Sequence, residues 1–232
     1  MMRPGSAAAP LRIAIFGAGG LGREILQALR DMQAAGAPVE CAGFIVDPGV
    51  AAAESLHGLP VRRGLEALLL GDANLHLVVA LGDPAARARI VQRVEAAVGP
   101  RFARVVHPRA WIGNTVQIGD GSMVLGLASV TTDVRLGRHV LVNPNASIAH
   151  DCVLEDFVTL APAVALAGGV HLEEGCELGI GARVAPRLRL GRWSVVGAGA
   201  VVIRPTPSGA TVVGVPARPL VRPPSPADEG AA

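Results

Sequence analysis

The sequence predicts an α/β half-domain followed by a left-handed parallel β-helix. Two observations support this prediction. Residues 11–105 alternate short apolar runs with stretches of helical spacing, and from residue 106 to residue 202 every sixth residue is Ile, Leu or Val. Alternating strands and helices favour a parallel sheet, and a strict period of six is typical of a coiled parallel β-helix.

The first 105 residues contain the elements of a Rossmann-like unit. LRIAIF at 11–16 is an apolar run rich in strand formers, GAGGLG follows it, and REILQALRDMQ then has helical spacing. Later apolar runs predict further strands, and a second helix should begin after Gly-Asp-Pro. We expect these strands at 41–46, 76–81 and 102–106, and the second helix at 85–98.

The repeat that begins at Val106 has no skipped or inserted residue. The position four residues after each aliphatic residue is usually small, as at Ala146 and Cys152. Three hexads form one triangular coil, so residues 18 apart should stack, with the aliphatic side chains inside and the small residues at crowded corners. Seventeen aliphatic residues follow this period: Val106, Ile112, Ile118, Val124, Val130, Leu136, Val142, Ile148, Leu154, Leu160, Leu166, Leu172, Leu178, Val184, Leu190, Val196 and Val202.

These patterns divide the chain into an α/β domain at 11–105 and a β-helix at 106–203. The segment 204–220 has turn residues at both ends and an apolar centre, and should cap the last coil. A cap is expected because an open coil end would expose strand edges. The Pro-rich residues 221–232 are expected to be a disordered tail.

Composition excludes several classes of function. All 21 basic residues are Arg, they are scattered along the chain, and the formal net charge is only +2, so we expect no nucleic-acid binding. No window approaches the 18 apolar residues that span a bilayer, so we expect a cytoplasmic protein without membrane insertion. Three cysteines with irregular spacing (Cys41, Cys152 and Cys176) predict neither a disulfide framework nor a metal site.

Several motifs resemble those of the hexapeptide-repeat acetyltransferases that act on nucleotide-linked amino sugars, the sialic-acid/bacillosamine type. The resemblance covers about residues 11–220 and rests on motifs in a fixed order. They are GAGGLG at 17–22, the FxxD that ends at Asp47, the GD…R element at 82–87, NASIAHDCVLEDF at 145–157 and VGVPAR at 213–218. The resemblance implies acetyl-CoA as co-substrate, no metal, a nucleotide-amino-sugar substrate and a homotrimer.

The resemblance also implies site residues. His150 matches the family's catalytic histidine and Asp151 its neighbouring carboxylate, while Gly168 matches a position near the acetyl group. Thr159, where the family often has a second histidine, and Ile180 and Ala198 correspond to acetyl-CoA contacts. Residues implied at the nucleotide sugar are Gly19, Gly20, Leu21, Asp47, Gly82, Asp83 and Arg87, with Leu21 in place of a common histidine.

The chemistry of acyl transfer is consistent with His150 as a general base. An imidazole titrates near neutral pH, and the third position of a hexad should project outward from the coil. No Cys or Ser has a nucleophile signature, so direct transfer through a tetrahedral intermediate is expected. A backbone N–H at Gly168 could stabilise the oxyanion.

The glycine loop fits G-x-G-x-x-G and should bind phosphate at a helix N-terminus. Only about 90 residues precede the β-helix, about half of a full dinucleotide-binding domain, so a nucleotide sugar fits better than NAD. Asp47 would then accept hydrogen bonds from the ribose or base, and Arg87 would contact phosphate.

Three alternatives stay open. The chain could O-acetylate a related sugar, or it could be a non-catalytic nucleotide-binding scaffold, a reading to which Leu21 and Thr159 lend support. It could also resemble the zinc carbonic anhydrases that are built on a β-helix, which need three converging histidines. The repeat histidines occupy different hexad positions, which argues against the zinc alternative: His107, His139, His150 and His171.

Overall fold

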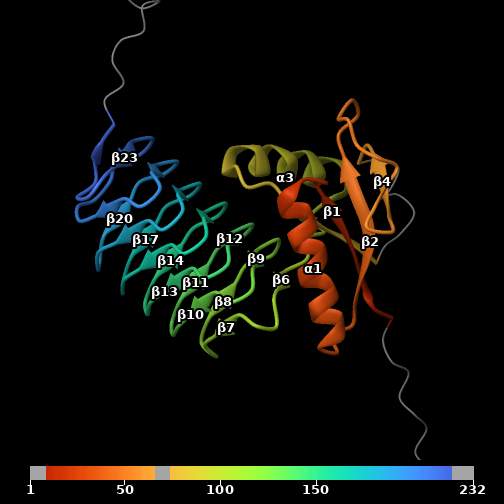
Figure 1. Ribbon diagram of the computed structural model, residues 1–232, viewed down its shortest axis with the longest axis horizontal. Coiled ribbons are helices and arrows are strands. Elements are labelled where there is room, and N and C mark those ends of the chain that lie inside the picture. The colour runs from red at the N-terminus through yellow and green to blue at the C-terminus, as the bar shows by residue number, and fades with distance from the viewer. Residues whose placement is uncertain (1–8, 66–73, 221–232) are drawn as a thin grey trace, which may run out of the picture.

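The computed structural model describes residues 9–65 and 74–220, so the expected tail at 221–232 lies outside the described residues. An α/β unit forms one end of the molecule and a long parallel β-helix the other (Figure 1). This arrangement confirms the predicted fold class. Within the described ranges, no helix has both the length and the apolar character needed to cross a bilayer.

The α/β unit is built on a five-stranded sheet. Its strands are β1 (Leu11–Phe16), β2 (Val39–Val46), β3 (Ser55–Leu56), β4 (Leu59–Arg63) and β5 (Leu75–Val79), in the order β3-β4-β2-β1-β5. β1 lies centrally and pairs in parallel with β2 and β5. Ligands bind such sheets at the carboxyl ends of the strands, where the strand order reverses.

In the described part of the α/β unit, two helices accompany the sheet, α1 (Gly20–Ala34) and α3 (Pro84–Val98). The start of α3 is fixed by the Gly-Asp-Pro sequence. Asp83 is the N-cap and accepts a hydrogen bond of 2.6 Å from the Ala86 N–H, and Pro84 occupies the first helical position.

Two features of this sheet differ from the sequence prediction. The hairpin of β3 and β4 was not predicted, although His57 and Gly58 between them both have positive φ, as a two-residue turn requires. The fourth strand predicted at 102–106 is wrong: Phe102 makes one isolated bridge to Leu77, and Val105–Val106 joins the β-helix instead.

The β-helix confirms the period of six. Every one of the seventeen aliphatic residues ends a two-residue strand, and each strand pairs in parallel with the strand 18 residues away. The strands are β6 (Val105–Val106), β7 (Trp111–Ile112), β8 (Gln117–Ile118), β9 (Met123–Val124), β10 (Ser129–Val130), β11 (Arg135–Leu136), β12 (Leu141–Val142), β13 (Ser147–Ile148), β14 (Val153–Leu154), β15 (Thr159–Leu160), β16 (Ala165–Leu166), β17 (His171–Leu172), β18 (Glu177–Leu178), β19 (Arg183–Val184), β20 (Arg189–Leu190), β21 (Val195–Val196) and β22 (Val201–Val202).

The corners of the coils combine a buried small residue with a left-handed residue. Small side chains such as Ala146 and Cys152 are buried at the fifth hexad position, as predicted. The turn itself lies one residue earlier, where φ is positive in every hexad from Gly121 to Gly199. Many of these residues are not glycine, and Asp151 (φ 60°) is one of them. Hydrogen bonds between successive coils hold them there, as from the Asp151 N–H to the Thr132 carbonyl at 3.2 Å.

The last coil is covered by β23 (Thr211–Val213) and β24 (Arg218–Pro219). β23 pairs in parallel with β21 and antiparallel with β24. This hairpin occupies the segment in which a cap was expected.

One face of the β-helix packs against the α/β unit. Met123 and Leu141, which point outward from adjacent strands of this face, are buried in the same apolar cluster as Ile25 and Leu29 of α1. The His107 Nε2 atom lies 2.8 Å from Asp31 Oδ2, which links the first coil to α1. This hydrogen bond lowers the pKa of Asp31.

The junction also encloses His139, which is fully buried. Its ring packs edge-on against Phe102 at 4.5 Å and stacks on Phe157 at 5.2 Å. Neither ring nitrogen has a hydrogen-bond partner among the described residues. Burial, together with the nearby Arg138 and Arg87, lowers the pKa of His139 to about 3, so the ring is neutral at physiological pH.

We expect His139→Phe to make the fold less sensitive to acid. Unfolded His139 titrates at 6.5 and the folded residue at about 3, so between these values only the unfolded chain binds the proton. The contribution of neutral His139 to the free energy of unfolding is complete above pH 6.5 and falls by about 1.4 kcal/mol per pH unit below it. Urea denaturation measures the free energy of unfolding at pH 7 and at pH 5. The decrease between these two pH values should be about 2 kcal/mol smaller in the variant than in the wild type. Equal decreases in the two proteins would contradict this account.

Candidate functional site

His150 and Asp151 form a pair at an outer corner of the β-helix. They follow β13, whose Ile148 points inward, so the period places the imidazole outside the coil. His150 Nδ1 lies 2.7 Å from Asp151 Oδ2, and both side chains are 66% exposed. A carboxylate on Nδ1 holds the proton there and leaves Nε2 as a proton acceptor.

The pair lines an open pocket of about 350 Å³. The other lining residues come from the next two coils, and they are Gly168, Gly169, Pro186 and Arg187. Gly168 has to be glycine for the imidazole to lie where it does. A Cβ atom on it would be 2.6 Å from Cε1 and 2.7 Å from Nε2 of His150.

The backbone at Gly168 offers a donor beside this imidazole. Its carbonyl accepts from the Arg187 N–H at 2.9 Å, whereas its own N–H donates to no acceptor in the described part of the chain. The N–H at this hexad position is also unpaired in some other described coils, so the distinguishing feature of Gly168 is its contact with His150. A base and a free backbone donor side by side can deprotonate a nucleophile and stabilise an oxyanion.

The other residues expected at acetyl-CoA lie elsewhere in the chain. Ile180 and Ala198 are exposed and stack on the corner that follows β18 and β21, whereas His150 lies on the corner that follows β13. Thr159 is 5% exposed, and its hydroxyl donates to the Gly82 carbonyl at 3.0 Å. The side chain of Thr159 is therefore buried in the domain junction, whereas the resemblance implied a contact with acetyl-CoA.

A second pocket, of about 490 Å³, lies at the carboxyl ends of β1, β2 and β5. The glycine loop forms one wall through Gly17 and Gly19, and α3 forms another. A smaller apolar pocket of about 280 Å³ continues past Gly19 toward the alanines that follow Val50. Apolar side chains form most of the lining of both pockets.

The close fit of the glycine loop explains its sequence. A Cβ atom on Gly22 would lie 2.0 Å from the Gly17 carbonyl oxygen, so only glycine lets α1 approach the loop. Around Gly19 and Gly20 there is open space within 4 Å, and Gly19 caps α1 without a side chain. The first N–H groups of α1 therefore face a region that a ligand can enter.

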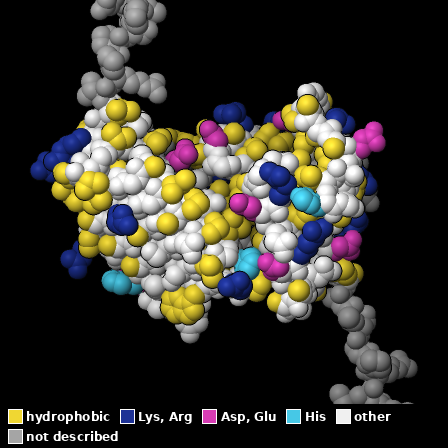
Figure 2. All heavy atoms as spheres, viewed as in Figure 1, with side chains coloured by type: hydrophobic (Ala, Val, Ile, Leu, Met, Phe, Trp, Pro, Cys, Tyr) yellow, Lys and Arg dark blue, Asp and Glu magenta, His cyan; other side chains and the backbone are white. Residues whose placement is uncertain are grey.

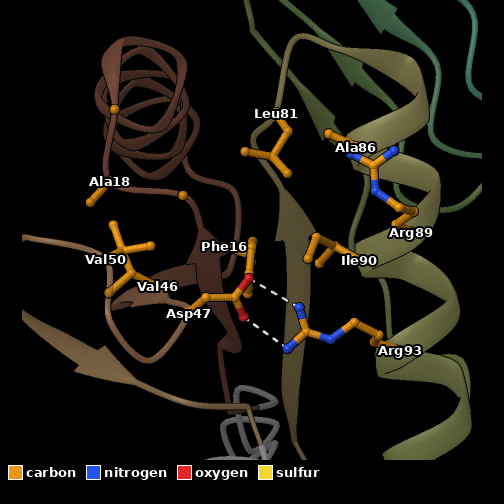
Figure 3. Close-up of a pocket in the computed structure, with 12 residues that line it drawn as sticks. Phe16, Ala18, Val46, Asp47, Val50, Leu81, Ala86, Arg89, Ile90 and Arg93 are labelled. Atoms are coloured by element: carbon orange, nitrogen blue, oxygen red, sulfur yellow. Dashed lines mark hydrogen bonds and ion pairs between the residues drawn. The ribbon is translucent and has the colours of Figure 1, made fainter.

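Charged side chains meet across the second pocket (Figure 3). Asp47, at the end of β2, forms a bidentate ion pair with Arg93 of α3 at 3.0 and 2.8 Å. Arg89 lies one turn earlier on the same helix face and also lines the pocket. In the described residues, Arg89 makes no hydrogen bond or ion pair, so its guanidinium is available to an anion.

Four residues predicted at the nucleotide sugar have other partners. The Gly82 carbonyl accepts from Arg87 at 3.1 Å, and Asp83 caps α3. Arg87 is 0% exposed and donates to groups of the protein, so the predicted phosphate contact is wrong. Leu21 packs against the apolar core of the α/β unit.

Arg89 and Arg93 were missed by sequence reasoning. Their spacing of four residues on a predicted helix was visible, because residues four apart share a helix face. Which face meets the pocket depends on how α3 packs, and a single sequence does not show this.

Charges of both signs are interspersed on the face shown in Figure 2. Among the described residues, no group of three His, Cys, Asp or Glu side chains could hold a metal ion.

Residues 12–94 match the family model of the PglD N-terminal domain. GDP-perosamine N-acetyltransferase of Escherichia coli O157:H7 is 30% identical over 217 residues, which are 91% of this chain and 97% of that protein. The chain belongs to the PglD-type hexapeptide-repeat nucleotide-sugar N-acetyltransferase family.

Solved structures of PglD-type proteins share the whole architecture. Perosamine N-acetyltransferase from Caulobacter crescentus, solved as a histidine mutant with CoA and GDP-perosamine, superposes with a TM-score of 0.83 at 30% identity and covers 93% of this chain and 99% of its own. The acetyltransferase domain of PglB from Neisseria gonorrhoeae FA1090, solved with acetyl coenzyme A, has a TM-score of 0.81 at 29% identity. The match covers 91% of this chain and all of that domain.

We expect Gly22→Ala to destabilise the α/β unit. The added methyl would overlap a backbone carbonyl, which cannot move away as a side chain could, so the free energy of unfolding should fall by about 1–3 kcal/mol. Gly20→Ala is the matched control, because nothing lies within 4 Å of its Cβ position. Urea denaturation of both variants tests this, and a Gly22→Ala protein as stable as Gly20→Ala would contradict the close approach.

Proposed function

We propose that this chain transfers the acetyl group of acetyl-CoA to the amino group of a nucleotide-linked amino sugar. The observation that carries the proposal is the His150–Asp151 pair beside Gly168 on a β-helix of this family. The relatives support the choice of substrates, since the perosamine enzyme was solved with CoA and GDP-perosamine and the PglB domain with acetyl coenzyme A.

The proposed reaction is a direct transfer. The amine nitrogen attacks the thioester carbonyl carbon as His150 Nε2 takes one of its protons, and Asp151 stabilises the imidazolium through Nδ1. The Gly168 N–H donates to the oxyanion of the tetrahedral intermediate. When the intermediate collapses, the C–S bond breaks, and the CoA thiolate takes the proton from His150. The products are the amide and free CoA thiol.

The second pocket is proposed to bind the nucleotide part of the sugar substrate. The N–H groups at the start of α1 and the guanidinium of Arg89 suit a diphosphate, because both favour negative charge. Asp47, held by Arg93, retains lone pairs that can accept from ribose hydroxyls. The apolar extension beyond Gly19 suits a base or deoxysugar.

A homotrimer is part of the proposal. Ile180 and Ala198 lie on a different corner from His150, so one chain does not place them at its own imidazole. Exposed apolar side chains on and near that corner, among them Leu127 (54%) and Ile180 (62%), favour packing against another copy. Three β-helices around an axis would bring such a corner to a neighbour's His150.

The decisive experiment is a substrate screen. UDP-, GDP- and dTDP-linked amino sugars are mixed with acetyl-CoA, and the release of free thiol is followed. We expect turnover with at least one of them, and a decrease of about 10²–10⁴-fold in His150→Ala because a general base is lost.

The outcomes of the screen separate the alternatives. Acetylated product on a hydroxyl would establish the O-acetyltransferase alternative. Thermal stabilisation by nucleotide sugars without any turnover would favour the non-catalytic scaffold. Near-normal turnover in His150→Ala would remove this residue from the role of base.

Gly168→Ala should reduce turnover without loss of stability. Its Cβ would displace the His150 ring, and an exposed ring can move at little cost in folding energy. A displacement of about 1 Å from the productive geometry can cost about 100-fold in rate. The measurements are kcat and the thermal unfolding midpoint, and a variant with normal kcat would show that the imidazole acts from another position.

A further inference from the structure

Arg87 of α3 has an unusual environment for a charged side chain. It is 0% exposed, and no carboxylate forms a direct ion pair with it among the described residues. Burial lowers its pKa to about 10, while Asp83 and Glu177 act in the opposite direction. The guanidinium therefore remains charged at neutral pH although it lies inside the protein.

All five N–H groups of this guanidinium are used to join two parts of the chain. Nη1 donates to the carbonyls of Leu81 (2.6 Å) and Gly82 (3.1 Å), in the loop before α3. The remaining donors reach the β-helix on two stacked coils. Nε donates to the His139 carbonyl at 2.9 Å, and Nη2 donates to the Phe157 carbonyl and the Thr159 hydroxyl, each at 2.8 Å.

Thr159 closes this arrangement. Its hydroxyl accepts from Arg87 and donates to the Gly82 carbonyl at 3.0 Å, so the loop is bound to the β-helix both directly and through the guanidinium. About two helical turns further along α3, Glu95 forms an ion pair with Arg138 of the β-helix. α3 is thus attached to the β-helix at two points.

The opposite face of α3 is a wall of the second pocket. Arg89 and Arg93 lie on that face, and Leu81 of the loop also lines the pocket. The same short segment therefore contacts the proposed nucleotide site on one side and two coils of the β-helix on the other.

Packing alone does not explain a buried guanidinium here. Removing a charge from water is costly, and apolar residues of similar volume often stabilise a junction equally well. What a guanidinium adds is direction, because its five donors fix the angles between the groups that they bind. We propose that Arg87 is a positioning residue, which with Thr159 sets the orientation of the nucleotide pocket relative to the β-helix that carries the catalytic base.

This inference rests on the proposed function. The amine is anchored through its nucleotide in the α/β unit, whereas the base and the thioester site belong to the β-helix, of this chain or of a neighbour. An error of about 1 Å at the reacting nitrogen can cost about 100-fold in rate. A small amine that is not anchored by a nucleotide needs no such alignment.

The test compares anchored and unanchored acceptors in four variants. Thr159→Val removes the hydroxyl at nearly constant volume, Thr159→Ser retains it, and Arg87→Lys retains the charge without the planar fork. Arg62→Lys, at an exposed position of β4, is the matched control for the arginine change. Each protein is assayed as the full chain, well below its own unfolding midpoint, with the nucleotide-linked amino sugar and with the same amino sugar free of its nucleotide.

We expect Thr159→Val and Arg87→Lys to lower kcat for the nucleotide-linked acceptor by about 10- to 100-fold. The KM for acetyl-CoA and the rate with the free amino sugar should not change. Thr159→Ser should restore most of the activity, and Arg62→Lys should resemble the wild type. If Arg87→Lys does not fold, the pair of Thr159 variants provides the same comparison.

Two outcomes would overturn the inference alone. Unchanged kcat in folded but less stable variants would mean that Arg87 and Thr159 only hold the fold together. An equal loss with both acceptors would mean that they act on the catalytic corner itself. Wild-type protein that acetylates no nucleotide-linked amino sugar would overturn the proposed function and this inference with it.

Discussion

The structure depends on the stacking of inward aliphatic side chains at intervals of 18 residues. Each such residue packs on the one above and the one below, and burying an aliphatic side chain contributes about 1.5–3 kcal/mol, which offsets part of the entropy of ordering the chain. Because the inward position is filled in every hexad, the outward positions are determined too. The exposure of His150 is therefore a consequence of Ile148 being buried.

The attachment of the α/β unit to the β-helix depends on contacts that the hexapeptide repeat does not specify. The α/β unit is attached through α1 and α3 to one face of the prism, where the outward residues Met123, Leu141 and Thr159 are buried instead of exposed. This junction contains both the apolar cluster and the enclosed polar groups His139 and Arg87. The molecule has two pockets apart from this junction, one at a corner of the coils and one at the end of a parallel sheet.

Sequence reasoning predicted the fold from a periodic signal and the His150–Asp151 pair from a resemblance to a family motif. The period of six identified every strand of the β-helix, and the neighbouring residues His150 and Asp151 pair as expected. Contacts between distant segments were not accessible in the same way. Arg87 and Arg89 lie two residues apart on one helix, and only the packing of α3 decides that the first is buried and the second reaches the pocket. The short hairpin at His57 was missed because its strands are too brief to show a period.

The unbroken count from Val106 to Val202 limits how this protein can vary in length. A single residue inserted into one of the coils would shift every later residue by one hexad position, so that aliphatic side chains would point outward. An insertion before Asp151 would also move its carboxylate away from the position with positive φ. Extra residues can therefore be accommodated as loops that leave the β-helix and return to it at the same corner. They can also be added at either end of the β-helix. The α/β unit has no such repeat, so a change of length in one of its surface loops need not shift the side chains that follow. Changes in length are therefore easiest in the half of the chain that does not contain His150.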